Sequence, residues 1–198
     1  MAFEPRILYA PAVFLSWPGK MTIVRRIFLL RHAKSSWSNA VLDDFERPLN
    51  GRGRRSADRM ARHMVETGVR PDLVLCSTAH RTRETFERLV PALRGVSVLF
   101  EDALYGATDQ DLINRLRRLD EAVRKVMVIG HNPGMERLAG RLAGSGDPDL
   151  RARLAEKYPT CGLTDIEIEA EAWGKIADGG GRLAAFVRPS DLEEGEGG

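Results

Sequence analysis

The stretch Ile27-Phe28-Leu29-Leu30-Arg31-His32-Ala33-Lys34-Ser35-Ser36-Trp37 determines how the fold is interpreted. Its four apolar residues stand between charged ones, a pattern typical of a strand buried on both faces of a parallel sheet. Ligands of open α/β sheets bind beyond the carboxyl ends of the strands, where Arg31 and His32 lie. A guanidinium can bind phosphate or carboxylate there, and an imidazole can act as nucleophile or acid–base group. Taken alone, so short a motif favours the plainer interpretation of a strand that happens to end in two polar residues.

The composition is that of a single globular domain with a sizeable core, since 43% of the 198 residues are hydrophobic. The 30 basic and 28 acidic residues give a net charge of +2 and are interspersed, so nucleic-acid binding is not predicted. The two cysteines, Cys76 and Cys161, make no disulfide framework and lack metal-site spacing, which favours a reducing cytoplasm. No stretch approaches the length of about 20 apolar residues that spans a membrane.

The two ends of the chain are expected to lie outside the domain. Residues 1–20 are interpreted as a loosely ordered extension, or as upstream sequence from a misassigned start, because Met21 would begin the chain just ahead of the first strand. They lack a signal-peptide cleavage pattern. The domain itself is expected over residues 21–190, and the acidic, glycine-rich segment 191–198 is expected to be disordered.

Strand and helix patterns alternate through the domain. Further strands are predicted at 72–76, 96–100, 126–129, 161–169 and 182–187. Apolar residues recur at helical spacing between them: Ala57, Met60, Ala61, Met64 and Val65; Phe86, Leu89, Val90 and Leu93; Leu112, Ile113, Leu116 and Leu119; Met135, Leu138, Ala139, Leu142 and Ala143. A short helix is expected near 147–157. This order predicts an α/β fold, a three-layer sandwich with a mainly parallel central sheet flanked by helices.

Loop residues add local expectations. Ser77-Thr78 is predicted to cap the following helix, Thr108 and Asp111 have capping-box spacing, and Asn132-Pro133 suits an N-cap and first helical position. The loop from Ser38 to Gly53 is long, and long loops in compact domains tend to be functional.

Three predicted strand ends bring Arg31 with His32, Arg81, and His131 toward one edge of the sheet. Two guanidiniums and two imidazoles without a cluster of cysteines or carboxylates indicate a pocket for a phosphoryl group rather than a metal site. The two remaining histidines are interpreted as surface or local structural residues: His63 and His80.

At these positions the sequence resembles the histidine phosphatase superfamily, which is phosphoglycerate-mutase-like and has an Arg-His-Gly signature. The matching segments are Leu30-Arg31-His32-Ala33, the loop from Arg47 to Gly53, Ser77 to Arg81 with Thr85, Gly130-His131-Asn132, Pro159-Thr160 and Arg188-Pro189. Within the superfamily, Arg-His-Ala-Lys-Ser-Ser-Trp is most similar to the small phosphohistidine phosphatases of bacterial phosphorelays. Ala33 departs from the usual glycine, which narrows the allowed backbone but removes no functional group.

The resemblance implies a role for each residue of the pocket. His32 would be the nucleophile that becomes phosphorylated, and Arg31, Arg81 and His131 would hold the oxygens of the phosphoryl group. These roles agree with the chemistry, because neutral imidazole carries a free lone pair and phosphoryl transfer needs its charge stabilised. No metal or other cofactor is implied.

A general acid is implied for substrates whose leaving group is an alkoxide. In the mutase-like branch a carboxylate precedes a Tyr-Gly pair by three residues, and here that position is Asp102, ahead of Tyr105-Gly106. The adjacent Glu101 remains an alternative general acid. A further alternative is that the two residues are a solvated acidic pair with no role in catalysis. Phosphohistidine as substrate would relax the need for an acid, because imidazole is a better leaving group than an alkoxide.

The function expected from these observations is a metal-independent phosphatase that works through a covalent phosphohistidine, on phosphohistidine of a protein partner. One alternative is a phosphatase of small phosphorylated metabolites, or a mutase-like enzyme, although the short chain leaves little room for the longer insertions of mutases. A second is a non-catalytic phosphate-binding protein, which would have no need for His32 as nucleophile. No nucleic acid or membrane partner is expected.

Overall fold

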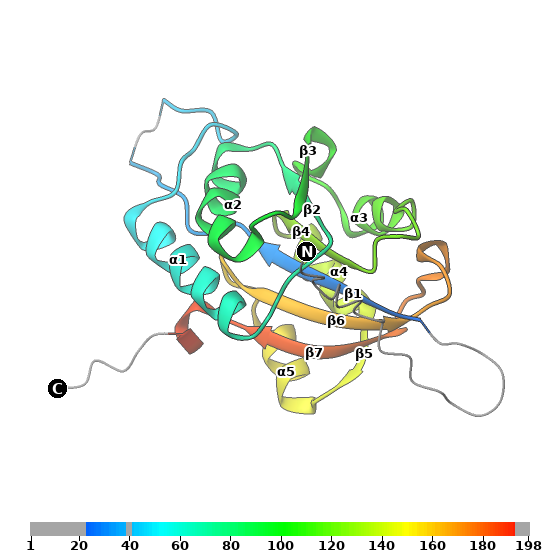
Figure 1. The fold of residues 1–198 in the computed structure, drawn as a ribbon. Coiled ribbons are helices and arrows are strands. Elements are labelled where there is room, and N and C mark those ends of the chain that lie inside the picture. Colours follow the sequence, from blue (N-terminus) through cyan, green and yellow to red (C-terminus); the bar gives the residue numbers. More distant parts are fainter. Residues whose placement is uncertain (1–22, 39–40, 193–198) are drawn as a thin grey trace, which may run out of the picture.

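The computed structural model describes residues 23–38 and 41–192, in which strands and helices alternate (Figure 1). The strands are β1 (Val24–Arg31), β2 (Leu73–Ser77), β3 (Ser97–Glu101), β4 (Lys125–Gly130), β5 (Ala143–Gly146), β6 (Leu163–Glu169) and β7 (Gly181–Val187). The α-helices are α1 (Gly51–Glu66), α2 (His80–Leu93), α3 (Asp109–Leu116), α4 (Gly134–Leu142) and α5 (Pro148–Glu156). Short 3-10 helices complete this part of the chain: η1 (Asp102–Leu104), η2 (Trp173–Lys175) and η3 (Pro189–Leu192).

The strands form one sheet in the order β3-β2-β4-β1-β6-β7-β5. Strands β3, β2, β4 and β1 pair in parallel, β6 is antiparallel to β1 and β7, and β5 is parallel to β7. The predicted α/β sandwich with a mainly parallel sheet is therefore confirmed. Because β1, β2 and β4 are parallel neighbours, their carboxyl ends lie at the same edge of the sheet.

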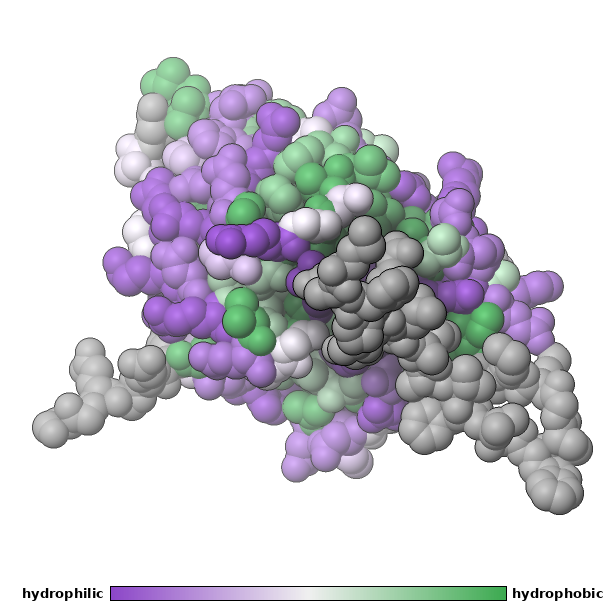
Figure 2. Space-filling view, viewed as in Figure 1, coloured by the Kyte–Doolittle hydropathy of each residue, from purple (hydrophilic) through white to green (hydrophobic). Residues whose placement is uncertain are grey.

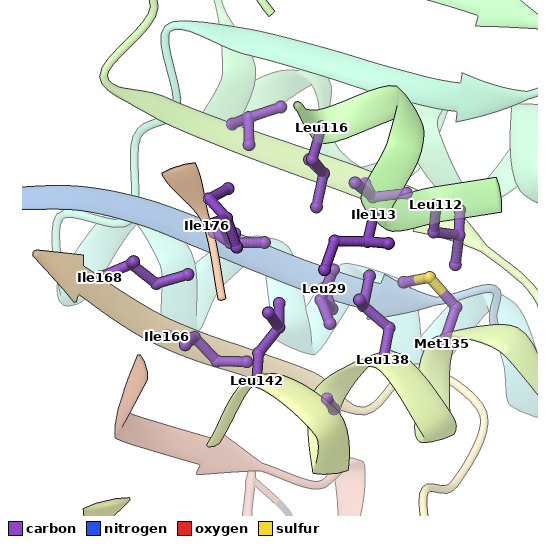
Figure 3. Packing of buried hydrophobic residues seen from close by; sticks show 14 of the residues in the cluster. Leu29, Leu112, Ile113, Leu116, Met135, Leu138, Leu142, Ile166, Ile168 and Ile176 are labelled. Carbon is purple, nitrogen blue, oxygen red and sulfur yellow. The ribbon is translucent and has the colours of Figure 1, made fainter. Parts of the chain in front are cut away.

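The side chains of β1 alternate between two buried cores, which is why its apolar run is continuous. Ile27 and Leu29 belong to the core under α3 and α4, whereas Phe28 and Leu30 belong to the core under α1 and α2. Figure 3 shows the first core, with side chains of α3 and α4 gathered over those of β1 and β6. Each fully buried aliphatic side chain stabilises this arrangement by about 1.5–3 kcal/mol relative to exposure.

The long loop after β1 folds back against the residues that follow that strand. The backbone N–H of Ser36 donates to the carbonyl oxygen of Pro48 across 2.8 Å, and that of Asn50 donates to Lys34 across 2.9 Å. Helix α1 approaches so closely that a Cβ on Gly53 would lie 2.1 Å from the Lys34 carbonyl oxygen, so only glycine fits there. The loop is thereby held beside the carboxyl end of β1.

Two local predictions are wrong and one is confirmed. The N-cap of α2 is Ala79, without a side-chain cap; the hydroxyl of Ser77 accepts the Ala79 backbone N–H at 3.5 Å and lies closer, at 2.8 Å, to Nε2 of His131. Helix α4 begins at Gly134 with Pro133 as its N-cap, because the Asn132 side chain donates instead to the carboxylate of Glu136 and the carbonyl oxygen of Tyr158. The capping box of Thr108 and Asp111 is present as predicted.

Two further differences concern packing. Ala143, expected on the stripe of a helix, begins β5, whose pairing with β7 is a tertiary contact that the segment's own glycines do not indicate. Val65 and Val90 continue the apolar spacing of α1 and α2 but are 59% and 42% exposed. Hydrophilic side chains cover most of the face seen in Figure 2 outside its grey residues.

The described residues include only part of the predicted domain boundaries. The expected extension, 1–20, lies outside the described residues, as does 193–198 of the expected tail, whereas Asp191 and Leu192 belong to η3. None of the helices in 23–38 and 41–192 has both the length and the apolar character needed to cross a membrane.

Candidate active site

The carboxyl ends of β1, β2 and β4 place the predicted site residues side by side. Arg31 is in register with Gly130, so His32 and His131 follow at the same level, and the His32 backbone N–H donates to the Gly130 carbonyl oxygen across 3.0 Å. The two imidazole rings lie with centroids 5.1 Å apart. Arg81 comes from the first turn of α2, which follows β2. The prediction that these four residues lie at one edge agrees with this arrangement.

The hydrogen bonds of His32 fix which ring nitrogen carries the proton. Its Nδ1 lies 2.7 Å from the carbonyl oxygen of Ala33, which can only accept, so Nδ1 is the donor. Its Nε2 receives the N–H of Arg81 Nε across 3.3 Å and therefore offers its lone pair. A neutral imidazole with a free lone pair on Nε2 is the nucleophilic form.

Burial keeps that imidazole neutral. His32 is 8% exposed, and its pKa is lowered to about 4, chiefly by burial and to a smaller extent by Arg81 and Arg31. The hydrogen bond to Ala33 and the carboxylate of Asp44 oppose this effect without overcoming it. The side chain is therefore unprotonated at neutral pH and needs no separate base.

His131 is likewise buried and neutral. Burial lowers its pKa to about 3, and His32 and Arg81 act in the same direction. Its Nε2 lies 2.8 Å from the hydroxyl of Ser77, whereas its buried Nδ1 has no hydrogen-bond partner among the described residues. If Ser77 donates to Nε2, Nδ1 is an N–H donor without a partner, and such donors are satisfied by a bound oxyanion.

The two arginines come from different elements, Arg31 from the end of β1 and Arg81 from the first turn of α2. Arg31 donates from Nη1 to the carbonyl oxygen of Tyr158 across 2.8 Å, and its buried Nε finds no partner within 23–38 and 41–192. Arg81 is 7% exposed, and Thr85 links its helix to β1, because the Thr85 hydroxyl accepts the Ala33 backbone N–H and donates to the Arg81 carbonyl oxygen. Both guanidiniums are thus anchored on secondary structure beside His32.

A carboxylate that the sequence did not single out also belongs to this site. Asp44, in the loop after β1, accepts Nη2 of Arg81 across 2.9 Å through Oδ2, and its carbonyl oxygen accepts Nη1 across 2.5 Å. The hydroxyl of Tyr105 donates to the same Oδ2 across 2.9 Å, and its ring meets that of His131 edge-on at 5.4 Å. The length of the loop was the only sequence signal for Asp44.

The two candidate acids occupy different surroundings. Asp102 is exposed in η1, and its Oδ1 accepts the hydroxyl of Thr78 across 2.6 Å, next to the Ser77 that contacts His131. Glu101 instead receives three hydrogen bonds from Arg115 of α3, from Nε and Nη2, at 2.7–3.0 Å. The carboxylate of Glu101 is thus held by an ion pair, and that of Asp102 lies at the margin of the site.

This geometry can be compared with known proteins. The model of the histidine phosphatase superfamily (branch 1) matches residues 27–105, which include Arg31, His32 and Arg81. SixA of Agrobacterium tumefaciens, named as a phosphohistidine phosphatase, is 33% identical, with a TM-score of 0.72 over 83% of this chain and 98% of its own. The chain belongs to the histidine phosphatase superfamily.

Two further proteins are similar to this chain. Protein Rv1276c of Mycobacterium tuberculosis is 32% identical over 164 residues, which are 81% of this chain and 99% of that protein. A mycobacterial glucosyl-3-phosphoglycerate phosphatase shares the fold, with a TM-score of 0.55 at 17% identity over 81% of this chain and 98% of its own. Membership of the histidine phosphatase superfamily implies phosphatase activity, while the substrates of its members differ.

Proposed function

We propose that this histidine phosphatase hydrolyses phosphohistidine on a protein partner through a covalent intermediate at His32. The observation that carries the proposal is the tautomer of His32, whose Nδ1–H is held by Ala33 and whose Nε2 lone pair faces Arg81. In the first step Nε2 attacks phosphorus, and the bond between phosphorus and the substrate's leaving atom breaks with its electron pair on that atom. In the second step water attacks the same phosphorus, its proton passes to solvent or phosphate, and His32 leaves as neutral imidazole.

The hydrogen-bond donors around His32 would stabilise the negative charge on the phosphoryl oxygens. Arg31, Arg81 and His131 hold those oxygens in the proposed mechanism, because fixed donors stabilise charge during phosphoryl transfer without having to reorganise. The unpartnered Nε of Arg31 and Nδ1 of His131 support this role, since an oxyanion would satisfy both atoms. His32 directly follows β1, and the hydrogen bond from its backbone N–H to Gly130 fixes its position at the edge of the sheet.

A nitrogen-linked substrate makes the smaller demand on the acids of this site. Glu101 is held by Arg115 and Asp102 lies exposed in η1, while departure of an imidazole from phosphorus needs no acid comparable to that for an alkoxide. The likeness to SixA at 33% identity supports the same substrate class. The two cysteines are free and buried, which supports a reducing cytoplasm as the location.

The proposal is tested with a panel of substrates at equal concentrations: a phosphohistidine protein, a phosphotyrosine peptide and small phosphomonoesters. We expect the highest kcat/KM for the phosphohistidine protein. A preference for a small phosphomonoester would assign the enzyme to metabolite phosphatases, and no hydrolysis of any substrate would favour a non-catalytic phosphate-binding protein. Each experiment includes His32→Ala, which removes the proposed nucleophile.

A further inference from the structure

Asp44 is held in the site by the backbone of its loop, not only by its side chain. The backbone N–H of His80, at the start of α2, donates to the carbonyl oxygen of Phe45 across 3.0 Å. The ring Nδ1 of His80 bonds the carbonyl oxygen of Glu46 across 3.2 Å, and Arg81 binds the carbonyl oxygen of Asp44 itself. These contacts fix the loop on the first turn of α2, so the position of the Asp44 carboxylate is built into the fold.

The carboxylate combines a fixed position with access from solvent. The Asp44 side chain is 49% exposed, while the guanidinium it binds on Arg81 is buried. Its Oδ2 accepts two hydrogen bonds, from Arg81 and Tyr105, which use about half of the acceptor positions of a carboxylate. Its Oδ1 lies 3.6 Å from Nη1 of Arg47, an ion pair without a hydrogen bond, so this oxygen retains acceptor capacity.

Its charge state limits what it can do to a substrate. Burial raises the pKa of Asp44, but Tyr105, Arg81 and Arg47 lower it by more, so that the net pKa lies below its ordinary value. Asp44 is therefore ionised at neutral pH, when it can accept an N–H but has no proton to give to an alkoxide. Such a group favours a leaving group that carries its own proton.

We propose that Asp44 is a specificity-determining residue for nitrogen-linked phosphoryl groups, because its carboxylate accepts the N–H of the imidazole ring nitrogen that is distal to phosphorus. This inference rests on the proposed phosphohistidine substrate. The substrate's P–N bond breaks with its electron pair on the ring nitrogen that held phosphorus, while the distal nitrogen keeps its proton. The product imidazole thus leaves neutral, and Nε2 of His32 has gained the phosphoryl group.

The same arrangement already exists for the attacking imidazole. Nδ1–H of His32, the nitrogen distal to the reacting one, is held by the carbonyl oxygen of Ala33 across 2.7 Å. Transfer from one imidazole to another has nitrogen on both sides of phosphorus, so the leaving ring needs an equivalent acceptor. Asp44 supplies it, and its negative charge strengthens a hydrogen bond from a ring that is cationic before the P–N bond breaks.

The test compares Asp44→Asn with Asp43→Asn on two substrates, a phosphohistidine peptide and para-nitrophenyl phosphate. Asp43 is the adjacent exposed carboxylate, and its Oδ1 accepts the backbone N–H of Phe45, an interaction that asparagine preserves. We expect Asp44→Asn to lower kcat/KM for the phosphohistidine peptide by about 10–100-fold more than for the aryl phosphate, the value of a charge-assisted hydrogen bond, because both substrates share any effect on Arg81 and only the first loses the acceptor for its leaving ring. Asp43→Asn should leave both substrates near the wild-type values.

The outcomes separate this inference from the proposed function. Equal losses on both substrates would assign Asp44 to positioning Arg81 alone and would overturn the inference, and so would a variant with wild-type kinetics. Wild-type enzyme that hydrolyses only the aryl phosphate would overturn the phosphohistidine substrate itself, before any variant is made. Asp44→Ala also removes the hydrogen bonds that the carboxylate accepts from Arg81 and Tyr105, so it should lower kcat/KM on both substrates, and by at least about tenfold more on the phosphohistidine peptide.

Discussion

Arg81 donates its Nε–H to Nε2 of His32 across 3.3 Å, so the lone pair of the proposed nucleophile accepts a hydrogen bond from a cation. Burial is the main reason that the pKa of this imidazole is lowered, and the positive charge of Arg81 adds to it by disfavouring protonation. The Arg81 guanidinium therefore lies next to the atom that would carry the phosphoryl group, Nε2 of His32. The contact with Nε2 must be released before the attack, when the phosphoryl oxygens become the new acceptors for Arg81.

The first prediction concerns His32 as the covalent nucleophile. His32→Ala should lower turnover by roughly 10³-fold or more, as expected when a nucleophile is removed. Quenching of the wild-type reaction without acid should trap phosphate on His32, identified by mass spectrometry. His63→Ala, which changes a histidine on α1, should retain wild-type turnover. If His32→Ala also retained it, the covalent mechanism would be wrong.

The second prediction concerns the pH dependence of stability. Burial lowers the pKa of His32 to about 4 and that of His131 to about 3, from 6.5. As the pH falls below about 6.5, unfolded chains gain protons on these rings that the folded protein does not, so the free energy of unfolding decreases toward pH 4. Each histidine contributes up to about 1.4 kcal/mol per pH unit in this range.

Urea unfolding between pH 7 and pH 4 measures this effect. The free energy of unfolding of His131→Gln should decrease less steeply with falling pH than that of the wild type, because one of the two buried rings is absent. Parallel curves for the two proteins would show that His131 is not responsible for the slope.

Much of the fold could be predicted because each β-strand near the site is a short apolar run ending in a distinct turn. The run Ile27 to Leu30 was identified as doubly buried, and both cores confirm it. The missed strand, β5, consists of Ala-Gly-Ser-Gly, and it is a strand only because β7 supplies its hydrogen-bond partners. Such pairing depends on residues far along the chain, which local patterns do not contain.

Some residues of the candidate site could likewise be predicted from the sequence, and others could not. Arg31, His32, Arg81 and His131 could be placed together because strand ends and parallel order determine their positions. Asp44 could not, because its contact with Arg81 depends on how a long loop folds onto α2. Two carboxylates adjacent in sequence, Glu101 and Asp102, could not be separated either, since the difference lies in Arg115 on α3.

The third prediction is that the phosphatase needs no metal ion. Within 23–38 and 41–192, no three side chains of histidine, cysteine, aspartate or glutamate are grouped so that they could hold one. Enzyme dialysed against EDTA should therefore keep its kcat/KM on para-nitrophenyl phosphate, and added Mg²⁺ or Zn²⁺ should not raise it. Loss of activity in EDTA that a divalent ion restores would contradict the proposed mechanism.

The last prediction tests whether Asp102 is a general acid, a role for which the sequence gives only its spacing from Tyr105-Gly106. An acid matters where the leaving group has a high pKa, so Asp102→Asn should slow an alkyl phosphate by about 10²–10⁴-fold. Para-nitrophenyl phosphate and phosphohistidine should change little, because their leaving groups depart without that proton.

Glu101→Gln is the matched control, because the Glu101 carboxylate is bound by Arg115 rather than presented to the site. It should change an alkyl and an aryl phosphate to the same degree, through stability rather than through the leaving group. Equal losses on both substrates for Asp102→Asn would instead indicate that Asp102 acts through its hydrogen bond to Thr78, beside the Ser77 that orients His131. No loss on either substrate would leave the proton to water, and a site without a general acid fits phosphohistidine better than an alkyl phosphate.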